Sequence, residues 1–152
     1  MMKFLISNLW LLYLAALVLA GIMYAVIDRP LFELKYCILT AAFAAVPDLI
    51  ALSGIRLFQK GNMIPAVIIA MLCVAAVITA GVICYANAGY GPAGTAGIAA
   101  AVLGVLSVIL CCVSFSGDPK RIILTACCLC GMLGVNYITG FLAALIMGFQ
   151  RA

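Results

Sequence analysis

Five apolar runs fill almost the whole chain, and each is long enough to cross a lipid bilayer as a helix. The hydrocarbon core of a bilayer is about 30 Å thick and takes about 20 helical residues. Inside lipid, every backbone N–H and C=O group must find a partner within the protein, so only helices and closed barrels can span it. The alternating pattern of barrel strands is absent. The runs therefore predict an all-α, polytopic transmembrane bundle of about five membrane-spanning helices.

The polar segments between the runs give the expected boundaries of the spans. Each break contains charged residues, glycine or proline, which are typical of turns. The first run exceeds the length of a signal-peptide core, so we interpret it as a retained span. Together the runs predict one integral membrane domain over residues 1–152, with no soluble domain. The predicted spans are 4–27, 36–57, 63–85, 92–115 and 122–149.

The composition narrows the chemistry that the chain can support. Hydrophobic residues make up 69% of the chain and charged residues only 8%, whereas a soluble domain has roughly a quarter charged residues. Without histidine and with only four carboxylates, the usual zinc, haem and acid–base sites are hard to build. The basic residues are spread over the loops, so we do not expect nucleic-acid binding. We expect no catalytic residue, cofactor or metal.

The distribution of Lys and Arg predicts the orientation of the chain. With five spans the termini lie on opposite sides, and the basic residues divide unequally between the two sides. Because Lys and Arg favour cytoplasmic loops, we expect a cytoplasmic N-terminus in the plasma (inner) membrane. The cytoplasmic set is Lys3, Arg56, Lys60, Lys120 and Arg121, and the opposite set is Arg29, Lys35 and Arg151.

The fourth run carries the clearest packing pattern. Small residues recur at alternating spacings of four and three, which places them along one side of a helix. Small side chains let two helix backbones approach closely, and such van der Waals contact holds helices together in lipid. The pattern favours either ordinary packing within the bundle or a tight homo- or hetero-oligomer. This small-residue seam is Ala93, Gly97, Ala100, Gly104, Ser107, Cys111 and Ser114.

Asp48 lies near the middle of the second run, roughly 15 Å from its end at 1.5 Å per residue. A central carboxylate is costly in lipid unless it is neutral, paired or hydrated. Thr40, Ala44 and Asp48 are spaced by one helical turn, so we expect them to face the bundle interior. Pro47 cannot donate a backbone hydrogen bond. Two interpretations follow: a broken helix with an ion or substrate site at the break, or a span that ends near Val46, with Asp48 capping a short interfacial helix.

Asn136 and Tyr137 lie at the centre of the fifth run. Asparagine in mid-membrane commonly hydrogen-bonds a neighbouring helix, and the depth of Asn136 matches that of Asp48. We therefore expect Asp48 and Asn136 to be partners. The role is either structural or the gating of protons or ions. The candidate intramembrane polar site is Asp48, Asn136, Tyr137 and Thr40.

Eight cysteines lie within or beside the apolar runs, where cysteine behaves as a small apolar residue. Cys127 and Cys130 form a C-x-x-C that is similar to the element used by the vitamin K epoxide reductase family. The residues G-D-P-K at 117–120 resemble the G-D-x-K element of the type IV prepilin peptidases. Each likeness covers four residues, and together they imply a membrane thiol or aspartyl enzyme as a remote alternative.

A chain of this kind must act through lipid, a small permeant or another membrane protein. We expect a non-enzymatic subunit of a transporter or other membrane complex. Its expected partners are the lipid bilayer and other membrane subunits or copies of itself. The alternative is a self-assembling channel or pore-like homo-oligomer.

Overall fold

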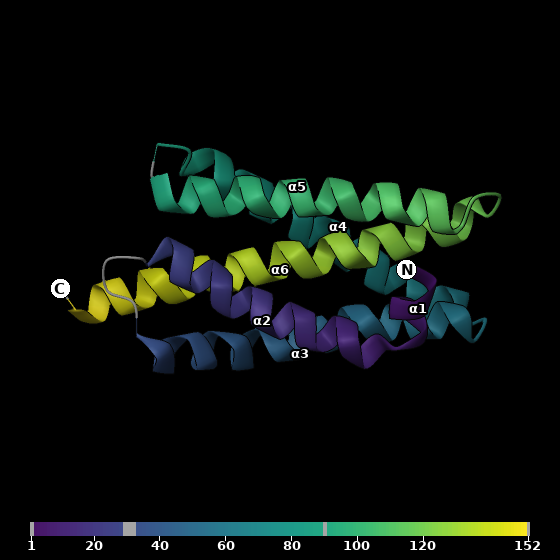
Figure 1. The fold of residues 1–152 in the computed structure, drawn as a ribbon, viewed down its shortest axis with the longest axis horizontal. Helices are drawn as coiled ribbons and strands as arrows, with labels where there is room; N and C mark the ends of the chain where they lie inside the picture. The colour runs from purple at the N-terminus through teal and green to yellow at the C-terminus, as the bar shows by residue number, and fades with distance from the viewer. Residues whose placement is uncertain (1, 29–32, 90, 152) are drawn as a thin grey trace.

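The computed structural model describes residues 2–28, 33–89 and 91–151, and this part of the chain is helical with no strand (Figure 1). Every helix except the first is long and apolar enough to span a membrane. The chain is therefore an integral membrane protein, and the predicted all-α bundle with five spans is confirmed. The helices are α1 (Met2–Ser7), α2 (Leu9–Ile27), α3 (Leu34–Gln59), α4 (Met63–Ala86), α5 (Gly91–Ser114) and α6 (Pro119–Arg151).

The first span begins at Leu9 and not at Phe4, because the helix is interrupted at Asn8. The backbone of Asn8 has φ −116° and ψ 66°, outside the helical region. Its side-chain amide donates to the carbonyl oxygen of Phe4 at 3.0 Å. Asparagine side chains of this kind compete with the backbone for hydrogen bonds and favour helix ends. The predicted run 4–27 is thus divided into α1 and α2.

Helix α6 is the centre of the bundle. It contacts all four of the other spans, and Figure 1 shows it running between α5 on one side and α2 and α3 on the other. With 33 residues, it is about 50 Å long at 1.5 Å per residue. This exceeds the hydrocarbon thickness of a bilayer, so α6 must tilt or reach into the headgroup region.

Three glycines of α6 provide its closest contacts with neighbouring helices. A Cβ atom added at Gly134 would lie 3.2 Å from the carbonyl oxygen of Ala76, and one added at Gly140 would lie 3.1 Å from the backbone nitrogen of Tyr24. Such short contacts mean that the helix backbones themselves touch, as small residues allow in lipid. The contacts join Gly131 to Cys73 of α4, Gly134 to Ala76 and Val77 of α4, and Gly140 to Met23 and Tyr24 of α2.

The outward faces of the helices present large aliphatic side chains. Ile64 of α4 is 77% exposed and Val113 of α5 is 72% exposed. In water such a surface would drive aggregation, since soluble monomers rarely expose large contiguous apolar patches. In a bilayer these side chains meet acyl chains of matching polarity, so this surface is the lipid contact of the protein.

Five basic residues belong to the end of the bundle where α2 and α6 begin and α3 ends, an end that Figure 1 shows. Arg121 lies 4.5 Å from the ring centroid of Phe115, which anchors the start of α6 by a cation–π contact. At the opposite end Lys35 pairs with Glu33 at 2.9 Å, and Arg29 lies outside the described residues. The side of the membrane that each end faces stays a prediction. The basic residues at the end where α6 begins are Lys3, Arg56, Lys60, Lys120 and Arg121.

Replacing Gly131 by alanine should destabilise the fold, because the added Cβ would lie 2.9 Å from the Cα atom of Cys73. We expect Gly131→Ala to lower the free energy of unfolding by about 1–3 kcal/mol, as overpacking does in other cores. The matched control is Gly148→Ala on the same helix, where nothing lies within 4 Å. The measurement is denaturant unfolding in mixed micelles. Equal stability of the two variants would show that α4 and α6 are not in backbone contact.

Candidate functional site

Asp48 lies on the buried face of α3, and none of its surface is exposed. Ala44 and Thr40, one and two turns before it, are 0% and 1% exposed. Residues spaced by one turn share a helix face, and α3 packs against α2, α4 and α6. The carboxylate is therefore enclosed by the bundle and is not at its lipid surface.

Helix α3 continues from Leu34 to Gln59 with Pro47 inside it. The interpretation that the span ends near Val46, with Asp48 capping an interfacial helix, is therefore wrong. The alternative of a broken helix is wrong as well, although the carboxylate does lie inside the bundle. Proline removes the donor for the carbonyl of Phe43. Residues on both sides of Pro47, such as Ala44 and Ala51, are buried in the bundle, so packing holds both halves of the helix in place.

Neither carboxylate oxygen of Asp48 has a hydrogen-bond partner among the described residues. The same is true of both polar atoms of Asn136, which is likewise 0% exposed. The expected hydrogen-bonded pair of Asp48 and Asn136 is therefore not formed. Helix α6 meets α3 through Cys128, whose Sγ would lie 3.3 Å from a Cβ atom at Gly54. At 100° per residue, Asn136 is turned by about 80° from Cys128, toward the side where Gly140 meets α2.

These unpaired polar atoms are expensive to bury. A buried donor or acceptor without a partner costs about 1–3 kcal/mol, and an ionised carboxylate in the membrane costs more. Most buried polar groups in proteins are hydrogen-bonded, so each exception calls for an explanation. Polar groups that persist within membrane spans mark substrate, ion or proton pathways. Asp48 and Asn136 are therefore the two candidate functional residues.

The other two predicted residues belong elsewhere. The Thr40 hydroxyl donates to the carbonyl oxygen of Tyr36 at 2.8 Å, within its own helix. The Tyr137 hydroxyl donates to the carbonyl oxygen of Ala93 at 3.2 Å, which ties α6 to α5. Both hydroxyls are satisfied, and Tyr137 points away from the side of α6 that carries Asn136. The structure therefore reduces the predicted set of four to Asp48 and Asn136.

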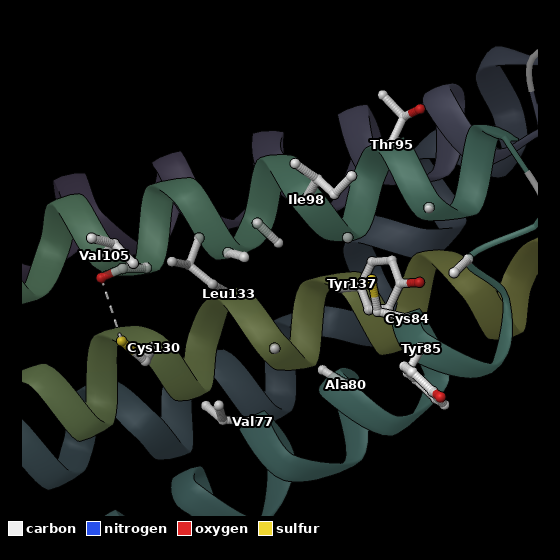
Figure 2. A pocket seen from close by; sticks show the side chains of 18 of the residues that line it. Val77, Ala80, Cys84, Tyr85, Thr95, Ile98, Val105, Cys130, Leu133 and Tyr137 are labelled. Carbon is white, nitrogen blue, oxygen red and sulfur yellow. Dashed lines mark hydrogen bonds between the residues drawn. The ribbon is translucent and has the colours of Figure 1, made fainter.

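The small-residue seam of α5 packs inward at its two ends and borders a groove between them. This groove, of about 900 Å³, lies between α4 and α5, with α6 as its floor (Figure 2). The seam alone could not predict the groove, because the separation of α4 from α5 depends on how both pack on α6. Of the seam, Ala93, Gly97 and Cys111 are buried, and Ala100, Gly104, Ser107 and Ser114 are half-buried.

The groove is lined mainly by small and aliphatic residues. Its polar groups are largely satisfied within the protein: the Cys130 thiol donates to the carbonyl oxygen of Gly104 at 3.7 Å, as Figure 2 shows. Val77 and Ile98 border it from α4 and α5. Such a surface can receive an apolar helix or an acyl chain, but it offers no chemistry of its own.

All eight cysteines are free thiols. Cys111 and Cys128 are 0% exposed and Cys73 is 6% exposed, so they pack as small apolar residues. Cys127 and Cys130 are not joined by a disulfide. Within the described residues, no group of three or more His, Cys, Asp or Glu side chains could hold a metal ion.

Comparison with protein-family models, with curated proteins and with solved structures finds no match for this chain. The function is therefore inferred from the residues of the chain itself.

Because Asp48 and Asn136 lack partners, apolar replacements should stabilise the fold. We expect Asp48→Leu and Asn136→Leu each to raise the free energy of unfolding by about 1–3 kcal/mol, the cost of an unsatisfied buried group. Thr40→Val is the matched control, since the Thr40 hydroxyl already has a partner and its loss should not stabilise. The measurement is denaturant unfolding in mixed micelles. If both leucine variants destabilise the protein, the two polar side chains are structural.

Proposed function

We propose that this chain is a small, non-enzymatic subunit of a membrane transporter, in which Asp48 binds the charge that the complex moves or couples to. The observation that carries the proposal is the complete burial of the Asp48 carboxylate in the bundle, with no hydrogen-bond partner in the part of the chain that the structure describes. At a purely structural position in this apolar bundle, burying leucine or alanine would cost less free energy than burying a carboxyl group. A carboxylate is useful there when its charge is neutralised and restored during function.

Asn136 supports the same role from the central helix. Its amide can donate to a carboxylate or accept from a carboxylic acid, so it can serve either charge state of Asp48. An asparagine that merely held helices together would already be hydrogen-bonded to a neighbour. Its polar atoms are instead unpaired, which leaves them available to a bound species or to Asp48 after a movement of α3 against α6.

The groove between α4 and α5 supports the assignment as a subunit. It is lined by small residues such as Gly97, Ala100 and Gly104, which allow close approach of another helix in lipid. The partners we propose are other membrane subunits in the plasma (inner) membrane, with the N-terminus of this chain cytoplasmic. Occupation of the groove by a second copy of this chain is the alternative, and it would give a pore-like homo-oligomer.

The test is charge movement in vesicles that contain the complex purified in mild detergent. A potassium gradient with valinomycin sets the membrane potential, and a potential-sensitive dye reports its dissipation. We expect wild-type complex to dissipate the potential and Asp48→Asn to abolish this, because asparagine keeps the size and hydrogen bonding but cannot carry charge. The control is Asp118→Asn, in the exposed turn before α6, where asparagine is an equally good helix cap.

Dissipation by Asp48→Asn at the wild-type rate would contradict the proposal, as would wild-type vesicles that behave like empty ones. The composition of the purified complex separates the two kinds of partner. Additional polypeptides support the heteromeric transporter, and a particle made only of this chain supports the pore-like homo-oligomer.

A further inference from the structure

The ligands that surround Asp48 restrict the kind of charge it can bind. The carboxylate itself supplies two oxygens, and the Asn136 amide makes no hydrogen bond to it. The other residues on this face of α3 are apolar: Ala44 one turn before Asp48, and Ala51 and Leu52 about one turn after it. The Thr40 hydroxyl is two turns away, about 12 Å along the helix at 1.5 Å per residue. Backbone carbonyls of the surrounding helices accept hydrogen bonds within those helices, and the Phe43 carbonyl of α3, whose donor Pro47 removes, brings the number of oxygens to three at most.

Three oxygens are too few for a metal cation in a dry site. Calcium takes about 6–8 oxygen ligands, and magnesium requires near-octahedral coordination and usually keeps several waters. A cation that lost its water here would gain only a fraction of the ligands it needs. A proton needs only a single carboxylate oxygen, and Asp48 supplies it.

The helices around Asp48 carry no charge that could neutralise it in place of a proton. On α2, α4 and α6 the charged residues of the described chain lie at the helix ends. The titratable side chains facing inward from these helices are neutral phenols and thiols. They include Tyr24, which donates to Asp28 at 2.6 Å, Cys73, which packs on Gly131, and Cys128, which lies beside Gly54. Apart from Asp48, the charged residues of α3 are Lys35 and Arg56, which lie near its two ends. Glu33 and Lys60 flank the helix.

We infer that the charge exchanged at Asp48 is a proton, which binds to one oxygen of the buried carboxyl group. The inference rests on the proposed function, in which Asp48 is the site of the coupled charge. In the step, a hydronium ion gives a proton to one carboxylate oxygen: one O–H bond of hydronium breaks and leaves water, one O–H bond forms on the carboxyl group, and the net charge of the site changes from −1 to zero. The reverse step returns the proton to water and restores the carboxylate.

The first measurement follows the pH inside the same vesicles with an enclosed pH-sensitive dye, in choline buffers free of sodium and magnesium. We expect the internal pH to change together with the membrane potential for wild-type complex and for Asp118→Asn. The pH change should be lost in Asp48→Asn. Movement of charge with no pH change would overturn the inference that the charge is a proton, and it would leave the transporter proposal intact.

The second measurement does not depend on transport. Thermal unfolding of the full chain in detergent is followed while NaCl, KCl or MgCl2 replaces choline chloride at constant ionic strength. A ligand that binds only the folded state raises the unfolding temperature. We expect the unfolding temperatures of wild type and of Asp48→Asn to respond alike to each cation. A cation-specific rise in the unfolding temperature of wild type that is absent from Asp48→Asn would overturn the inference. If vesicles move no charge at all, the proposed function fails, and this titration still decides whether Asp48 binds a metal cation.

Discussion

The whole bundle depends on close backbone contact between α6 and its neighbours. In lipid there is no hydrophobic force to bring helices together, so packing at short range has to do so. Gly131, Gly134 and Gly140 remove side chains at the points where α4 and α2 approach. This lets one helix contact all the other spans. The position of each inward-facing side chain, Asn136 among them, follows from how α6 is held.

The same packing buries two polar side chains, those of Asp48 and Asn136. With α2, α4 and α6 packed against one face of α3, Asp48 has no access to the surface and no hydrogen-bond partner among the described residues. Asn136 lies on the helix that packs beside it, one turn before the Gly140 contact with α2. Stability alone gives no reason to place a carboxyl group and an amide there, since leucine would cost less. The reversible charge that we propose for Asp48 gives the carboxyl group such a reason.

Much of the fold could be predicted from the sequence, because lipid imposes simple rules on length and polarity. The five apolar runs gave the five spans, and the spacing of Thr40, Ala44 and Asp48 predicted one inward face. The interruption at Asn8 was missed because a single asparagine in a long apolar run does not alter its hydropathy. Whether α3 would continue through Pro47 could not be predicted, because it depends on tertiary packing, which no local sequence pattern reports.

The candidate site was predicted in part. The depths of Asp48 and Asn136 suggested a hydrogen-bonded pair, but the rotation of α6 about its axis, set by its glycine contacts, directs Asn136 toward α2. Tyr137 was included in the site because it is adjacent in sequence, yet adjacent residues on a helix face different neighbours, and Tyr137 bonds to α5. The groove between α4 and α5 arises from tertiary packing, and the seam of α5 indicated only one of its walls.

The most direct test of this account is the protonation state of Asp48 in the folded protein. Infrared spectroscopy of the purified chain with isotope-labelled aspartate carboxyl groups reports it, because a carboxylic acid and a carboxylate absorb at different frequencies. The chain has only three aspartates, Asp28, Asp48 and Asp118. We predict a carboxylic acid band at neutral pH that is absent from Asp48→Asn and retained in Asp118→Asn. A spectrum with carboxylate bands alone would show that Asp48 is ionised inside the bundle, and would contradict its role as the proton-binding group.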